Sequence, residues 1–180
     1  GKGDSFLMWG DLSAAISVAV IVMLLATNDP RFAWLYIAIP ISGFTASGIK
    51  TYKAKRKSHV ASTYASNTIN NVWAIISAVF AVYAISCLLH FGEVRSWYGM
   101  FLLGMLLPGI GTYTTGVILK EKSIQVCGLL GVVIGTGLLR DFVCGEQVIS
   151  IMQMGQMVLS FVITLIIPGH ILNFKAKKQQ

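Results

Sequence analysis

The chain has 180 residues, of which 55% are hydrophobic and only 12% are charged. A soluble domain carries about a quarter charged residues, because its surface must face water. The shortage of charge argues against a soluble enzyme, a nucleic-acid-binding domain and a disordered chain, even though the net charge is +7. The composition therefore favours an integral membrane protein with no nucleic-acid partner.

Six apolar segments are long enough to cross a bilayer as helices, which needs about 20 residues each. In chain order they cover residues 6–27, 33–49, 69–91, 97–119, 124–143 and 147–174. The fifth segment is the weakest, because Arg140 and Asp141 interrupt its outer end. The runs are continuous and show no two-residue alternation, so we expect helices rather than barrel strands. The sequence predicts an all-α, polytopic membrane domain that covers residues 1–180.

The first apolar segment carries Asp11 and has no small-residue cleavage site or extended basic region before it. These features are unlike a cleaved signal peptide, so we expect this segment to be the first membrane span. The bilayer is then the immediate partner of every predicted helix.

Positive residues mark alternate ends of the predicted spans. Eleven of the 14 lysines and arginines fall in four groups: Lys2; Lys50, Lys53, Lys55, Arg56 and Lys57; Lys120 and Lys122; and Lys175, Lys177 and Lys178. Lysine and arginine are enriched in cytoplasmic loops, so both termini are expected in the cytoplasm of a bacterial inner membrane. The same rim is expected to attract anionic lipid headgroups, although orientation alone explains the pattern more simply.

The three even-numbered spans each contain a proline and run into a lysine at their basic end: Lys50, Lys120 and Lys175. The prolines are Pro40, Pro108 and Pro168. Their spacing predicts three parallel helical hairpins, over residues 5–58, 66–122 and 123–178, with a possible pseudo-threefold axis along the membrane normal. Each proline removes a backbone donor and is expected to kink its helix. The carbonyl that loses its donor must then bond to a neighbour, a side chain or water.

A few polar side chains fall within the apolar segments and are the candidate functional residues. We expect a cavity between the kinked helices, lined by Asn71, Thr112, Thr115, Gln153, Gln156 and Asp11. Amides and hydroxyls in a bilayer face the helix bundle, where they either line a cavity or bond another helix. Helix-to-helix bonding is the simpler explanation for the amides. Interface placement is the simpler explanation for Asp11.

Glycine pairs indicate where helices can approach closely. Gly131 and Gly135 form a Gly-x-x-x-Gly pair on the fifth predicted helix. Such a pair allows backbone contact within the bundle or between copies of the chain, so a homo-oligomer is possible on this pattern.

No catalytic or metal site is expected. The three histidines (His59, His90 and His170) lie near different ends of the predicted spans, and no metal-ligand spacing occurs. Cys87, Cys127 and Cys144 are expected to be reduced packing residues. No nucleophile–base pair can be named, so we expect neither an enzyme nor a cofactor.

Family resemblances add little about function. The chain lacks the charged motif after proline in the odd helices of mitochondrial carriers, which excludes that family. A six-helix chain of this size is similar to the substrate-binding subunit of vitamin-uptake transporters, where a small-residue face like Ala15 and Ala19 docks the partner. Residues 3–10 and 167–172 resemble small six-helix bacterial membrane proteins that have no assigned activity.

Two functions follow from these observations. The first is a component of a small-molecule or ion transporter with a central polar cavity. The alternative is a non-transporting membrane scaffold or regulatory partner whose helices pack through glycine.

Overall fold

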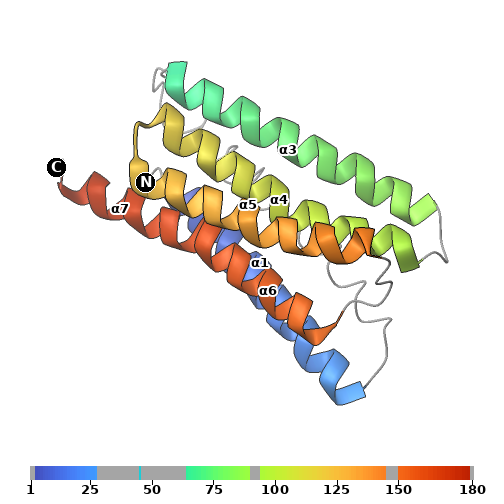
Figure 1. Cartoon of the computed structure of the whole chain (residues 1–180). Helices are drawn as coiled ribbons and strands as arrows, with labels where there is room; N and C mark the ends of the chain where they lie inside the picture. The colour runs from blue at the N-terminus through green and yellow to red at the C-terminus, as the bar shows by residue number, and fades with distance from the viewer. Residues whose placement is uncertain (1–2, 28–44, 46–63, 90–93, 145–149, 179–180) are drawn as a thin grey trace.

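The computed structural model describes residues 3–27, 45, 64–89, 94–144 and 150–178, and the regular structure in these parts is entirely helical (Figure 1). The elements are α1 (Asp4–Thr27), α3 (Tyr64–Leu89), α4 (Val94–Ile118), α5 (Lys122–Val143), α6 (Ile151–Phe161), the π-helical segment η2 (Val162–Ile166) and α7 (Ile167–Lys178). The last three follow one another without a break and form one rod. The predicted all-α fold is confirmed for the described residues.

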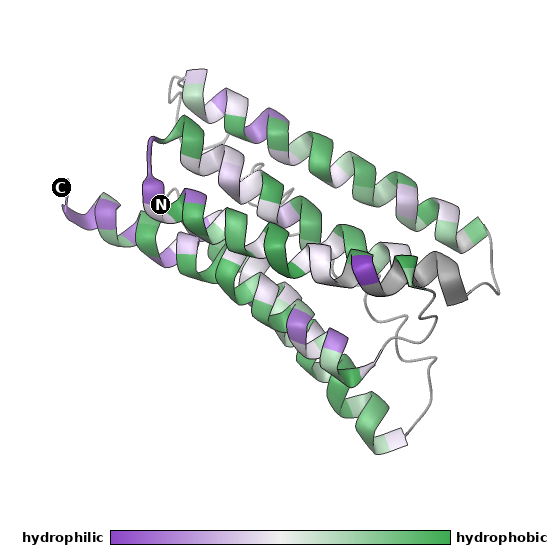
Figure 2. Cartoon of the chain, in the orientation of Figure 1, coloured by the Kyte–Doolittle hydropathy of each residue, from purple (hydrophilic) through white to green (hydrophobic). Residues whose placement is uncertain are grey.

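Four helical segments are long and apolar enough to cross a membrane: Asp4–Thr27, Tyr64–Cys87, Gly99–Ile118 and Ile151–Lys178. A fifth apolar stretch, Lys122–Gly137, is shorter. Hydrophobic residues colour the outer faces of the rods in Figure 2, and Ile75 on α3 and Val133 on α5 have well-exposed side chains. Such surfaces are stable in lipid rather than in water, which indicates a membrane protein.

Six spans are not confirmed, because the helix predicted over residues 33–49 lies outside the described residues except for Thr45, and Pro40 also lies outside them. The three-hairpin repeat and its threefold axis are not confirmed either. α4 and α5 form the most extensive helix contact among the described elements. The predicted repeat assigns these two helices to different hairpins. Glycines allow this pairing, because a Cβ on Gly109 would lie 2.9 Å from the backbone nitrogen of Val132.

The turn between α4 and α5 explains how these helices become neighbours. Lys120 follows α4 in the left-handed conformation, with φ of 57°. Its N–H donates to the carbonyl of Val117 at 3.1 Å, and the N–H of Glu121 donates to the carbonyl of Gly116 at 2.8 Å. This pair of bonds is the Schellman arrangement that ends a helix sharply. The chain can therefore reverse direction within a few residues.

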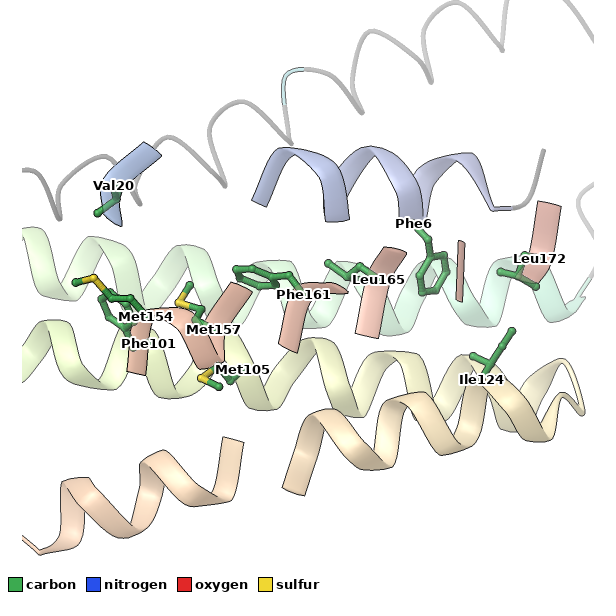
Figure 3. Packing of buried hydrophobic residues seen from close by; sticks show 10 residues of the cluster. All are labelled: Phe6, Val20, Phe101, Met105, Ile124, Met154, Met157, Phe161, Leu165 and Leu172. Atoms are coloured by element: carbon green, nitrogen blue, oxygen red, sulfur yellow. The ribbon is translucent and has the colours of Figure 1, made fainter. Parts of the chain in front are cut away.

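α1 runs antiparallel to the rod formed by α6, η2 and α7. Near the start of α1, Gly3 donates its N–H to Oδ1 of Asn173 at 3.1 Å, and Asn173 donates Nδ2–H to Asp4 at 2.9 Å. Figure 3 shows Phe6 near Leu172 at one end of the core and Val20 near Met154 at the other. Both ends of the described chain consequently lie together, as Figure 1 also shows.

α4 runs parallel to α6 and η2, and the hydrophobic core fills the contact between them. Phe101 and Met105 of α4 are buried against Met157 and Phe161 of the rod (Figure 3). Further along, Thr112 of α4 bonds to η2. The start of α6 is fixed by Ser150, whose hydroxyl accepts from the N–H of Gln153 while the Gln153 side chain accepts from the N–H of Ser150. This reciprocal capping box explains why α6 begins at Ile151.

Basic side chains gather at the end of the bundle where the chain termini lie. Lys175 of α7 forms an ion pair with Glu121 in the turn before α5. The ammonium group of Lys178 lies 4.8 Å from the centre of the exposed Phe174 ring. Hydrophilic residues colour the terminal turns of α7 in Figure 2. Positive residues from two distant parts of the sequence therefore share one end of the molecule.

Candidate functional site

A buried polar contact joins α4 to η2. The hydroxyl of Thr112 donates a hydrogen bond of 2.7 Å to the backbone carbonyl of Thr164. Pro168 stands four residues after Thr164 and has no N–H to donate to that carbonyl. Both threonine side chains are fully buried. A side chain of a neighbouring helix therefore replaces the backbone donor that proline removes.

Two further hydroxyls, those of Thr164 and Ser160, lie along the rod beside this contact and form a polar stripe with Thr112. Thr164 donates its own hydroxyl to the carbonyl of Ser160 at 2.7 Å. Ser160 is also fully buried, and its hydroxyl oxygen has no hydrogen-bond partner among the described residues. This stripe faces inward together with Met157 and Pro168, which are also buried.

Thr115 lies one turn beyond Thr112 and bonds to a different helix. Its hydroxyl donates to the carbonyl of Gly111 at 2.7 Å and accepts from Nε1 of Trp73 at 3.1 Å. The Trp73 ring packs edge-to-face against Phe6, with centroids 5.3 Å apart. α3 begins at Tyr64 rather than 69, so Trp73 lies farther inside and joins three helices.

Three glycines of α5, Gly128, Gly131 and Gly135, lie inside the bundle. A Cβ on Gly131 would collide with Cγ2 of Thr164, and one on Gly128 would collide with the backbone of Tyr113 in α4. A Cβ on Gly135 would lie 2.7 Å from Cδ2 of Leu106. In the single chain, the Gly131–Gly135 face is thus covered by α4 and η2, an arrangement that brings helix backbones close together.

The other predicted lining residues lie apart from this contact. Gln153 is buried, but its side chain caps the start of α6. It precedes Thr164 by 11 residues, which corresponds to about 16 Å along a helix. Gln156 is half-buried, whereas Asn71 on α3 and Asp11 on α1 are exposed. Of the six predicted lining residues, only Thr112 and Thr115 lie in the buried polar region of α4 and η2. The other four lie outside this region.

Sequence reasoning missed Ser160, Thr164 and the role of Ser150. Signals for two of them were present. Thr164 stands four residues before a proline, the position whose carbonyl loses its donor. Ser150 followed three residues later by Gln153 is the sequence pattern of a capping box. No comparable local pattern singles out Ser160, because its environment depends on which helix packs against it.

Within the described residues, no group of three or more histidine, cysteine or acidic side chains could hold a metal ion. His59 and His90 lie outside those residues, and His170 is exposed on α7. None of the three cysteines forms a disulfide bond among the described residues: Cys87 is buried, Cys127 is half-buried and Cys144 is exposed. The chemistry available in the described polar region is hydrogen bonding by hydroxyls and backbone carbonyls.

No protein-family model matches the chain, and comparison with curated proteins and with solved structures returns no significant match.

Proposed function

We propose that the protein is a non-enzymatic, non-transporting membrane subunit that acts by binding a partner within the bilayer. The observation that carries this proposal is the use of small and polar residues inside the bundle. The hydroxyls of Thr112 and Thr115 bond to other helices or to their own backbone. Gly128 and Gly131 of α5 bring helix backbones close together. These groups hold the helices of the bundle together. The outer surface of the bundle is then the part that can bind a partner.

The outer face of α1 is the best candidate for that recognition. Asp11, Ala15, Val18 and Val22 are spaced at helical intervals and all have exposed side chains. The opposite face packs on the rod, with Gly10 against Leu165 and Ile166. An acidic residue within a membrane-spanning helix is costly in lipid, so it is usually placed where a partner, water or the interface receives it. The small side chain of Ala15 allows another helix to approach closely.

The basic end of the bundle sets the orientation that we propose. Lys120, Lys122, Lys177 and Lys178 have exposed side chains, and Lys175 is paired with Glu121. By the distribution of positive residues, this end faces the cytoplasm of a bacterial inner membrane, with both termini on that side. Anionic lipid headgroups would then lie against the same lysines.

Photo-crosslinking in native membranes tests the proposal. A benzophenone amino acid in place of Ala15 lies on the outer face, whereas the same group in place of Ser17 lies on the fully buried face and serves as the matched control. We expect a discrete protein adduct from position 15 and none from position 17. The adduct should disappear when Val22 is changed to Trp on the same face. Labelling of lipid alone from position 15 would contradict the proposal. Crosslinking between differently tagged copies would identify the partner as a second copy.

A second function, a component of a small-molecule or ion transporter, is favoured by one specific feature. η2 interrupts the last rod with five π-helical residues that end at Ile166, two residues before Pro168, and π-helical turns are frequent at functional sites. Flux into proteoliposomes decides between the two functions. Ion or metabolite flux that depends on Thr112 and Thr164 would replace the interaction proposal with the transport function. Vesicles with no flux above protein-free controls would support the interaction function.

A further inference from the structure

Ser160 differs from the other buried hydroxyl residues of the described chain. Ser17, Thr115 and Thr164 each donate to the backbone carbonyl four residues earlier, at 2.7 Å in every case. Ser160 has no such bond, although its side chain is fully buried. A buried hydroxyl without a partner is unfavourable, and in a bilayer no bulk solvent is available to satisfy it.

The neighbour of Ser160 across the helix contact can be identified from two flanking contacts. On one side, the methyl group of Met157 lies against Gly104 of α4. On the other side, Thr164 bonds to Thr112 of the same helix. Ser160 lies between Met157 and Thr164, as Pro108 lies between Gly104 and Thr112. Because α4 and the rod are parallel, Ser160 stands at the level of Pro108.

At this level Pro108 leaves a second polar group, a backbone carbonyl of α4, without its helical hydrogen bond. Pro108 lies inside α4 and cannot donate to the carbonyl of Gly104, four residues earlier. Carbonyl groups of a helix point toward its C-terminus, so the oxygen of Gly104 is directed toward the level of Pro108 and Ser160. The equivalent carbonyl before Pro168 receives the hydroxyl of Thr112. No side chain among the described residues donates to Gly104 in the same way.

The packing beside Gly104 is looser than the packing beside the other buried glycines of α4. Gly104 is buried, yet a Cβ placed on it would meet only the terminal methyl of Met157, at 3.4 Å. The other buried glycines of this helix have no such space, since a Cβ on Gly109 would lie 2.9 Å from a backbone atom. A polar interior site with two hydrogen-bonding groups and spare room is the setting in which proteins bind water.

We propose that Ser160 and the Gly104 carbonyl bind one buried water molecule between α4 and α6. The water donates to the carbonyl oxygen of Gly104 and exchanges a hydrogen bond with the hydroxyl of Ser160. On α4 the water donates to the carbonyl before Pro108, just as the Thr112 hydroxyl donates to the carbonyl of Thr164 before Pro168. The proposal is independent of whether the protein binds a partner or transports a solute.

X-ray radiolytic labelling of the full-length protein in nanodiscs, in water enriched with oxygen-18, tests this site. Bound water activated by the beam oxidises side chains beside it, even where bulk solvent is excluded. Met157 reports on the site, and Met154 is the internal control because it is equally buried on the same helix. We expect rapid, several-fold greater oxygen-18 incorporation at Met157 than at Met154. Ser160→Ala should reduce Met157 to the level of Met154, whereas Ser17→Ala should leave it unchanged.

Equal labelling of Met157 and Met154 in the unaltered protein would overturn the proposal. So would Met157 labelling that persists in a folded Ser160→Ala variant. If that variant does not fold, Gly104→Ala provides an independent test, because its methyl group occupies the space available to the water. Loss of Met157 labelling in Gly104→Ala supports the site, and undiminished labelling contradicts it.

Discussion

The hydroxyl of Thr112 on α4 donates to the backbone carbonyl of Thr164 in η2, at 2.7 Å. The bond exists because Pro168 leaves that carbonyl without its usual backbone donor. The hydroxyl of Thr112 thus supplies the hydrogen bond that Pro168 cannot donate. This relationship ties the parallel helices together at the depth where the rod changes from α-helical to π-helical geometry.

Removing this hydroxyl should destabilise the bundle. Thr112→Val keeps the size of the side chain and deletes the donor to Thr164. Interhelical hydrogen bonds in membrane proteins contribute about 0.6 kcal/mol on average and up to about 1.7 kcal/mol. We expect a loss near the upper end, because Pro168, four residues after Thr164, has no N–H to donate to this carbonyl. Unfolding free energies measured by steric trapping in bicelles provide the comparison.

Thr114→Val is the matched control for that measurement. The Thr114 hydroxyl bonds to the carbonyl of Ile110 in its own helix, at 2.8 Å, and contacts no other helix through that bond. Its loss should change the free energy of unfolding by less than that of Thr112→Val. Equal effects of the two substitutions would show that the bond between α4 and η2 contributes nothing specific.

The glycine contact between α4 and α5 predicts a sharp difference between two alanine substitutions. Gly128→Ala places a methyl group against the backbone of Tyr113, which cannot move aside as a flexible side chain would. Overpacking of this kind costs about 1–3 kcal/mol. Gly137→Ala, on the same helix, meets no atom within 4 Å. It should stabilise the protein by about 0.5–1 kcal/mol, because alanine favours a helix interior over glycine.

Thermal unfolding of both glycine variants in detergent checks this prediction. The melting temperature should fall for Gly128→Ala and stay level or rise for Gly137→Ala. A fall of similar size in both would mean that α4 and α5 do not meet at Gly128.

The turn at Lys120 offers a stabilising substitution. Lys120 adopts φ of 57°, a conformation that glycine tolerates without steric cost. The left-handed conformation costs a residue with a side chain about 1–2 kcal/mol. We expect Lys120→Gly to raise the unfolding free energy by about 1 kcal/mol. Lys122→Gly, in the first turn of α5, should instead lower it, since glycine is a poor helix former. Circular dichroism melts of the two variants test the opposite signs.

The positions of the helices could be predicted from sequence because bilayer thickness fixes the length of an apolar span. Their ends were harder to place, since capping depends on single residues. The last rod begins at Ile151 rather than 147 because Ser150 and Gln153 cap it. The same capping assigns Gln153 a local role that helical periodicity alone does not suggest.

The pairing of helices could not be predicted from sequence in the same way. A glycine such as Gly131 permits close approach but does not name the partner, which here is Thr164 of η2. The polar region is therefore assembled from residues that no spacing rule connects. Thr112 could be selected as a polar residue within a span. Thr164 required knowledge of which helix lies beside it.

α5 and η2 meet at one close contact between small residues. Gly131 and Thr164 test it directly, because a Cβ on Gly131 would collide with the Cγ2 methyl of Thr164. Thr164→Ser removes that methyl and keeps both the hydroxyl and the backbone carbonyl. A double-mutant cycle on the unfolding free energy therefore isolates the contact.

We predict that Gly131→Ala destabilises the unaltered protein by about 1–3 kcal/mol, as overpacking does. In the Thr164→Ser background the loss should be smaller by about 1 kcal/mol or more, which is a coupling typical of residues in contact. Additive effects of the two substitutions would contradict the packing described for α5 and η2.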